Sequence, residues 1–158
     1  MFAVGDVANA YHPFYGRRLR VEHWDNARGQ GTTAALNMLG RGVPYDRVPY
    51  FFSDQYEVGI EYRGDATEAD RVVFRGEPAA RTFYAFWLDG EDRVVAGAHV
   101  QPHDHGHAHG HGEHEHAADD GVGSIEAIIR SRARVDARRL AAVDKALHGL
   151  TYAASRAS

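Results

Sequence analysis

An acidic residue near the start of the chain could bind the hydroxyl groups of a ligand. Asp6 follows Gly5 and the apolar run Met1–Val4, and this pattern predicts a buried strand that ends in Gly-Asp. Open α/β sheets bind their ligands at the carboxyl ends of their strands, where a carboxylate accepts strong hydrogen bonds from a polyol. The alternative is an ordinary turn, in which Asp6 bonds to the backbone that follows it.

A second group of candidate residues stands at the start of a predicted helix. Small and apolar residues recur every three or four positions from Glu22 to Leu39, which predicts a helix over this range. Its first turn would carry His23 and Trp24, and the positive N-terminus of the helix could face the same ligand as Asp6. A tryptophan on a helical face is otherwise an ordinary core residue, and His23 is otherwise a structural, hydrogen-bonded histidine.

Seven histidines stand close together among Gly, Asp, Glu and Ala, between positions 101 and 123: His103, His105, His107, His109, His111, His114 and His116. Imidazole and carboxylate ligands suit zinc, nickel or copper. Neutral imidazole is the binding form, so metal affinity should fall below about pH 6. The alternative is a disordered surface insertion, because the tract lacks apolar periodicity and a longer loop costs little entropy.

The rest of the chain predicts the strands and helices that would position these groups. An aromatic segment at 48–52 precedes four predicted strands, at 56–62, 71–75, 82–88 and 93–100. Asp89-Gly90 predicts a tight hairpin turn with positive φ angles, and strands joined by such short turns are antiparallel. Two helices are predicted to follow, one capped by Ser124 and one from Val135 to Leu150. The predicted fold class is α+β, an antiparallel sheet with flanking helices.

Bulk composition excludes several classes of protein. The 158 residues carry a net charge of −4 and no cysteine. The charge gives no case for nucleic-acid binding, and the lack of cysteine removes disulfides, thiolate metal sites and iron–sulfur ligation. The sequence has no apolar stretch long enough to span a bilayer and no signal-peptide pattern. We therefore expect no membrane association and a cytoplasmic location.

Several segments, taken in order, resemble one family of enzymes. The segments are 2–9 (FAVGDVAN), 16–18 (GRR), 21–27 (VEHWDNA), 37–40 (NMLG) and 48–55 (VPYFFSDQ). Together they resemble the C-terminal part of FAD-dependent, NAD(P)H-oxidising ferredoxin reductases of the rubredoxin and putidaredoxin reductase type, related to apoptosis-inducing factor. The resemblance covers Met1 to about Gly97 and resumes from about Ile125 to Leu140. It implies FAD as cofactor, NAD(P)H as co-substrate and a ferredoxin or rubredoxin as electron acceptor.

The resemblance also implies a set of cofactor-binding residues: Gly5, Asp6, Glu22, His23, Trp24, Ala27 and Phe52. Asp6 would hydrogen-bond the ribityl chain of FAD, and Trp24 would pack beside the isoalloxazine. Phe52 stands where the family usually carries tryptophan, which puts a tryptophan-specific contact in doubt. The flavin carries out the chemistry, so no catalytic side chain is expected in this chain.

No Gly-x-Gly-x-x-Gly motif occurs in the sequence, so both dinucleotide-binding fingerprints of the family would lie upstream of Met1. We expect a fragment, inactive alone, whose partners are the missing FAD and NAD domains. Residues 1–45 would be the strand-helix remnant of an α/β FAD-binding domain, 46–145 the reductase C-terminal domain with a histidine-rich insertion at 101–123, and 146–158 a tail. The alternative is a stand-alone, histidine-rich module that binds divalent metal or a partner on a reductase-derived scaffold.

Overall fold

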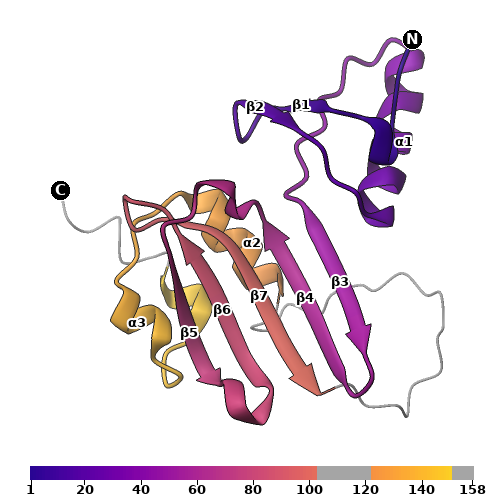
Figure 1. The fold of residues 1–158 in the computed structure, drawn as a ribbon. Coiled ribbons are helices and arrows are strands. Elements are labelled where there is room, and N and C mark those ends of the chain that lie inside the picture. Colours follow the sequence, from indigo (N-terminus) through magenta and orange to yellow (C-terminus); the bar gives the residue numbers. More distant parts are fainter. Residues whose placement is uncertain (103–121, 151–158) are drawn as a thin grey trace. The chain divides into compact units, whose positions relative to one another are not determined.

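The computed structural model describes residues 1–102 and 122–150. The chain divides into two compact units, Met1–Phe51 and Phe52–Ser158, which are described in turn. Figure 1 shows the elements of both units coloured along the sequence. Within the described ranges, no helix has the length and apolar character that a bilayer span requires.

The first unit consists of a short 3₁₀ helix, a two-stranded hairpin and one long helix: η1 Gly5–Val7, β1 Ala10–His12, β2 Arg17–Leu19 and α1 Trp24–Met38. Helix α1 confirms the helix predicted over 22–39. It ends where Gly40 adopts a positive φ of 77°, a conformation that glycine takes without the penalty of a Cβ atom.

The start of the chain differs from its prediction. Met1–Val4 is exposed and forms no strand, and Asp6 lies in η1 instead of ending a buried strand. Apolar side chains and unpaired backbone groups favour a strand only when a neighbouring strand and a covering layer are present. The described residues supply neither to Met1–Val4.

The β1–β2 hairpin was not predicted. His12 pairs with Arg17, and the Gly16 N–H donates to the His12 carbonyl across the turn. Strands of three residues are too short to show the alternation of apolar and polar residues on which the prediction relied. Gly16, with a φ of 65°, allows the chain to reverse there.

The second unit is built on a five-stranded sheet whose strands are β3 Tyr50–Gln55, β4 Val58–Gly64, β5 Arg71–Glu77, β6 Thr82–Leu88 and β7 Val94–Pro102. The strand order is β3-β4-β7-β6-β5, and the registers of β4, β5, β6 and β7 are antiparallel. Short 3₁₀ turns, η2 Ala66–Glu68 and η3 Pro78–Ala80, precede and follow β5. The predicted antiparallel sheet is confirmed, with β3 arising from the aromatic segment.

The turn between β6 and β7 is organised by Asp89 and not by a tight Asp-Gly pair. The Asp89 carboxylate accepts hydrogen bonds from the backbone N–H groups of Glu91 (3.0 Å) and Arg93 (2.9 Å). Burial alone would raise the pKa of Asp89, but these bonds and the Arg93 side chain outweigh it and lower that pKa. The positive φ of the turn falls on Asp92, at 63°. The prediction of a tight turn with positive φ at Asp-Gly is therefore wrong. The Asp89 side chain instead accepts hydrogen bonds from the backbone N–H groups of a longer loop.

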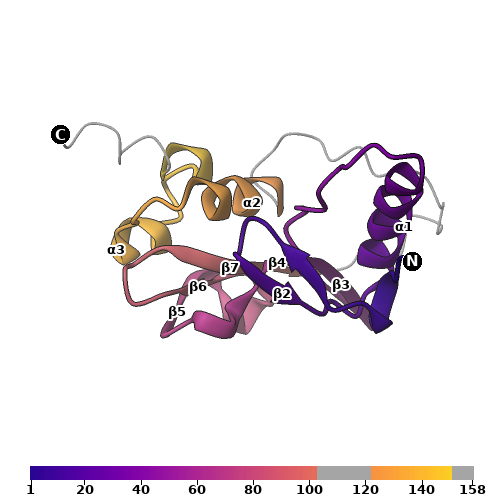
Figure 2. The same cartoon turned by 90° about the horizontal axis from the view of Figure 1, so that it is seen from above.

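Two helices cover one face of the sheet, α2 Val122–Ser131 and α3 Ala137–Ala141, followed by η4 Leu147–Leu150. Figure 2 shows both helices on the same side of the strands. The core between the layers contains large side chains that are almost fully buried: Phe86, Leu88, Ile125, Ile128, Leu140 and Leu147. Helix α2 begins two residues before Ser124, so this serine lies inside the helix and is not its predicted cap.

The long helix predicted from Val135 to Leu150 is wrong, because α3 ends at Ala141. The buried guanidinium of Arg75, on β5, donates to the carbonyls of Ala142 (2.7 Å) and Leu140 (3.4 Å) and also to the carbonyl of Lys145. These carbonyls point to a cation, so they do not accept from N–H groups four residues onward as a continuing helix requires. A buried arginine in a distant strand thus ends the helix.

Candidate functional site

A glycine joins η1 to the first turns of α1. Gly5 is buried and has a φ of 74°, and a Cβ atom added to it would lie 3.3 Å from the Cβ of Ala27. Its N–H donates to the Gln30 side-chain oxygen at 2.8 Å. Two predicted cofactor-binding residues, Gly5 and Ala27, therefore contact each other. Their contact holds the segment that carries Asp6 against the helix.

Asp6 itself is exposed in η1, next to this contact. Its carboxylate is open to solvent, and the start of α1 lies one turn before Ala27 in the helix. An exposed carboxylate and a helix N-terminus in one unit offer hydrogen-bond acceptors and a positive electrostatic potential to the same ligand. This arrangement suits a molecule with both hydroxyl groups and a partly negative ring.

His23 is the N-cap of α1. The N–H of Asp25 points to Nδ1 of His23 at 3.4 Å, and the N–H of Ala27 donates to the His23 carbonyl at 3.1 Å. A histidine in this role explains how the helix begins without serine or aspartate at its cap. The cap fixes the position of the next residue, Trp24.

Trp24 is the first residue of α1 and is 48% exposed. The guanidinium carbon of Arg28, one turn later, lies 4.9 Å from the centre of its ring. A cation over an indole ring is attracted to it and limits its motion. The ring is therefore positioned at the surface and is not part of the core, contrary to the alternative left open from the sequence.

Aromatic rings surround the cap residue. The ring centre of His23 lies 5.6 Å from that of Phe51, 6.0 Å from that of Trp24 and 6.1 Å from that of Tyr50. All four belong to the first unit, which ends at Phe51. The cluster gives the start of α1 an aromatic surface beside its positive end.

Polar residues that were not predicted from the sequence bond to the first turn of α1. Asn26 is buried, and its side chain donates to the Val21 carbonyl (2.9 Å) and accepts from the Tyr45 hydroxyl (3.0 Å). Burial raises the pKa of Tyr45, which keeps this donor protonated. Arg47 pairs with Asp25 at 3.3 Å. The sequence signal that could have revealed these contacts is the pair Asn26 and Gln30, four residues apart on one face of the helix. Polar side chains that become buried need hydrogen-bond partners.

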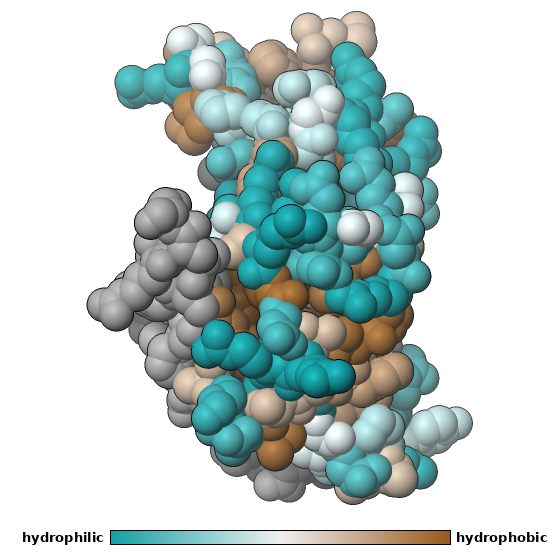
Figure 3. Space-filling view, turned by 90° about the vertical axis from the view of Figure 1, so that its left-hand side faces the viewer, coloured by the Kyte–Doolittle hydropathy of each residue, from teal (hydrophilic) through white to brown (hydrophobic). Residues whose placement is uncertain are grey.

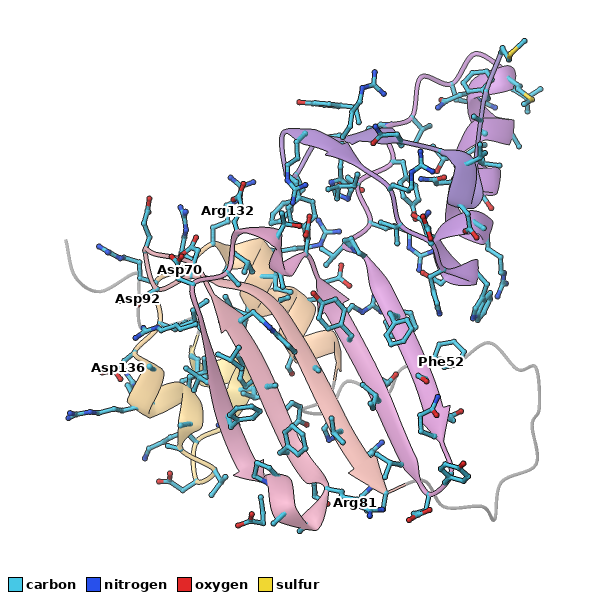
Figure 4. All side chains as sticks on the ribbon, viewed as in Figure 1. Phe52, Asp70, Arg81, Asp92, Arg132 and Asp136 are labelled. Carbon is cyan, nitrogen blue, oxygen red and sulfur yellow. The ribbon has the colours of Figure 1, made fainter. Side chains whose placement is uncertain are left out.

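The remaining predicted site residues lie apart from this group. Glu22 is exposed just before the cap. Phe52 belongs to the second unit and lies on the edge strand β3 (Figure 4). The seven histidines of the predicted metal site fall outside the described residues. Within residues 1–102 and 122–150, no group of three or more His, Asp or Glu side chains could hold a metal ion.

The exposed groups of the first unit are of the chemical kinds that one end of a flavin requires. Asp6 offers an exposed carboxylate for hydroxyl groups, and α1 offers its N-terminus with an exposed aromatic ring beside it. The sequence has no glycine-rich motif that could hold a pyrophosphate. The donor set therefore suits the ribityl chain and ring of FAD but not its diphosphate.

Comparison with known protein families shows to which family the chain belongs. The family model described as Reductase C-terminal matches residues 50–151. The chain belongs to this family. This match, together with the relatives and solved structures described next, confirms the resemblance to ferredoxin reductases and the α+β fold of the domain.

Curated relatives of this family member are reductase components. The chain is 38% identical over 100 residues to the anthranilate 1,2-dioxygenase system ferredoxin–NAD(+) reductase component of Burkholderia cepacia, which covers 63% of this chain and 25% of that protein. It is 40% identical over 97 residues to putidaredoxin reductase of Pseudomonas putida, covering 61% of this chain and 22% of that protein. The chain thus spans about a quarter of the length of these relatives.

Solved structures agree with the family. The covalent putidaredoxin reductase–putidaredoxin complex matches 97% of this chain and 33% of the other chain, with a TM-score of 0.74 and 31% identity. The ferredoxin reductase for the CYP199A2 system of Rhodopseudomonas palustris matches 61% of this chain and 24% of the other, with a TM-score of 0.58 and 33% identity.

Proposed function

We propose that this chain supplies the C-terminal part of a flavoprotein reductase in which NAD(P)H reduces FAD and FAD passes electrons to a ferredoxin or rubredoxin. The family match supports the proposal, as do relatives whose names describe ferredoxin–NAD(+) reductases. The observation that carries it is the exposed pair formed by Asp6 and the start of α1, which Gly5 holds together.

Each residue of this site has a proposed role. Bound FAD would supply the exchange of a hydride for single electrons. Asp6 would accept hydrogen bonds from ribityl hydroxyl groups, and the N-terminus of α1 would stabilise negative charge on the ring. Trp24, positioned by Arg28, would pack beside the flavin, and Phe52 would shape the site where electrons leave.

The division of the chain follows from the same proposal. Residues 1–45 would complete a FAD-binding domain, 46–145 would form the reductase C-terminal domain with its insertion at 101–123, and 146–158 would form a tail. The cytoplasm is the proposed location, since relatives are named as ferredoxin–NAD(+) reductase components of dioxygenase systems.

A chimera tests the proposal. This chain replaces the matching C-terminal segment of putidaredoxin reductase of Pseudomonas putida, and the chimera should retain FAD and oxidise NADH. Asp6→Asn should weaken FAD binding about 10- to 100-fold, because a hydrogen bond to a charged acceptor contributes about 1.5–3 kcal/mol. Flavin fluorescence on dilution measures the affinity.

The matched control for the chimera is Glu68→Gln, which neutralises an exposed acid in η2 of the other unit. It should leave the FAD affinity unchanged. A folded chimera that holds FAD equally well with Asn at position 6 would contradict the role of Asp6. A chimera that folds but cannot retain FAD would contradict the proposed function.

A second candidate function rests on the histidine tract. Seven histidines within 103–116 offer ligands for zinc or nickel. Deleting residues 103–118 should abolish zinc and nickel binding measured by calorimetry, and binding to the full chain should weaken below about pH 6, where imidazole protonates. A second variant replaces the seven histidines by asparagine. It keeps the length of the loop and should also lose metal binding. Metal binding that survives both changes would contradict this candidate.

A further inference from the structure

The charged side chains of β4–β7 lie on the side of the sheet that also packs against the helices. Directly paired residues of neighbouring strands share a face, so the printed registers assign each residue to one side. The row Glu61, His99, Tyr84 and Arg75 runs across β4, β7, β6 and β5. Arg75 reaches the carbonyls after α3, so this charged row lies on the side that the helices cover.

A second contact places charged side chains on the same, helix-covered side of the sheet. Arg63, in the next row, pairs with Glu126 of α2 at 3.3 Å. A Cβ atom added to its strand partner Gly97 would lie 3.3 Å from the ring of Phe86 and would overlap the side chain of Ile125 in α2. Arg63 and Arg75 therefore both reach partners in the helical layer.

The opposite side of the sheet is uncharged. We call it the open face and define it by six side chains: Ile60, Tyr62, Val72, Phe74, Phe83 and Trp87. Between them, Ala96 and Ala98 of β7 and Ala85 of β6 complete the same rows. Across β4–β7 the residues in these rows carry no charge, and the helices described in the second unit, α2 and α3, lie on the other side of the sheet (Figure 2). An antiparallel sheet with one face in solvent normally presents polar residues there.

The open face forms an ordered aromatic layer. The rings of Tyr62 and Trp87 lie 5.5 Å apart over the alanines of β7, and those of Phe74 and Phe83 lie 5.8 Å apart. Val72 and Phe74 remain 42% and 53% exposed on the edge strand. Figure 3, which looks at the β5 side, shows apolar surface among hydrophilic residues there. Exposed apolar side chains gathered on one face are typical of an interaction site.

We propose that the open face is a self-association surface, which packs on the open face of a second copy of this chain. A two-fold interface places each residue type against the same surface of its partner, so charged residues would meet like charges. An uncharged face avoids this repulsion. Two twisted sheets can pack face to face about 10 Å apart with their strands about 30° from parallel.

The absence of charge also argues against a redox protein as occupant. Transient redox partners rely on complementary charges for fast encounter, and the rows on β4–β7 offer none. Charged residues also lie at the ends of the sheet, with Asp70 and Asp92 at one end and Arg81 at the other (Figure 4). The chemistry of the face therefore suits a neutral, apolar partner surface.

The size of the face sets the strength of the dimer. The four strands β4–β7, about 4.8 Å apart and with about seven residues rising about 3.3 Å each, give a face of about 440 Å². Two copies would bury about 900 Å², which is in the range of weak, transient interfaces. We therefore expect a weak dimer, with a dissociation constant in the micromolar range.

Sedimentation of the full chain over a concentration series tests this proposal. The chain should shift from monomer to dimer, and Phe74→Glu should raise the dissociation constant at least 10-fold, as should Val72→Glu. The Trp24→Phe variant leaves Trp87 as the sole tryptophan, because the sequence contains two. Its emission should move to shorter wavelength as the dimer forms and Trp87 loses water.

Two exposed apolar residues outside the open face provide matched controls. Leu39→Glu and Val143→Glu change side chains that are 75% and 69% exposed, and neither should alter the dimer. Circular dichroism checks that every variant is folded, which the exposure of Val72 and Phe74 favours.

Three outcomes would overturn the proposal. The chain could sediment as a monomer at all concentrations. Phe74→Glu could leave a dimer as strong as the Leu39→Glu control does. A monomeric chain could bind a ferredoxin through a contact that Phe74→Glu abolishes, which would assign the open face to the electron acceptor. None of these readouts involves flavin, so they are separate from the test of the proposed function.

Discussion

Replacing Arg75 with methionine should lower the free energy of unfolding by about 3 kcal/mol, because a buried charge-assisted hydrogen bond contributes about 1.5–3 kcal/mol and several are lost together. Arg75 is buried on β5 and holds the carbonyls of Leu140, Ala142, Val143 and Lys145. Methionine fills a similar volume but donates no hydrogen bond. The melting temperature should fall by about 6–12 °C for a domain of this size.

Urea denaturation measures this change, and trypsin adds a local readout at Lys145, which should be cleaved faster in the variant. The matched control is Arg71→Met, four residues earlier on the same strand. Arg71 is 47% exposed and pairs with Asp92, and an exposed pair contributes at most about 1 kcal/mol. Equal losses at the two positions would contradict the anchoring role of Arg75.

Replacing Gly64 with alanine should cost about 3 kcal/mol or more. Gly64 ends β4 with a φ of 105°, where an added Cβ atom would lie 2.7 Å from the Ala96 Cα and would also overlap the Val95 carbonyl. A side chain at positive φ costs about 1–3 kcal/mol, and overpacking adds about 1–3 kcal/mol. Backbone atoms cannot move aside as a flexible side chain can, so the end of the β4–β7 pair must open.

Gly31→Ala is the control for this prediction. Gly31 lies inside α1 with no atom within 4 Å of an added Cβ, so alanine should stabilise the helix by up to about 1 kcal/mol. Thermal unfolding should therefore shift in opposite directions for the two variants. A Gly64→Ala protein as stable as the unchanged chain would contradict the close approach of β7 at this position.

The parts of the fold that the sequence predicted are those with strong local signals. The strand Thr82–Leu88 was predicted with the bounds that it has, because it is rich in aromatic residues and stands between clear turns. The helix at Trp24–Met38 was predicted because its period is sustained over four turns.

The differences arise from contacts that the pattern of apolar and turn residues does not report. Arg75 ends a helix that local propensity would continue past Ala141. The Asp89 side chain replaces the backbone turn that Asp-Gly usually forms. Met1–Val4 has an apolar pattern, but a strand exists only with a partner. The contact of Arg75 and the lack of a partner strand for Met1–Val4 cannot be read in a window of a few residues, whereas the Asp89 bonds lie within one, and there Asp-Gly was interpreted as a tight backbone turn.

The candidate site was predicted as a list of residues and not as an arrangement. Asp6 and Trp24 were selected from the Gly-Asp and helix patterns and then from the family resemblance, and whether they hold a flavin stays a prediction. The contact of Gly5 with Ala27 depends on a positive φ that the sequence permits but does not require. The capping role of His23 was outside the usual preference for serine or aspartate at a helix start.

The Asp89 turn bears on the order in which the sheet assembles. The β6–β7 pairing closes a loop of only a few residues, and Asp89 ties that loop with its own side chain. The β4–β7 pairing joins residues such as Gly64 and Ala96, whose intervening chain includes two other strands. Short loops close with less loss of entropy than long ones. During folding, the three-stranded β5–β6–β7 meander should therefore form first, and β4 should be added later, together with β3.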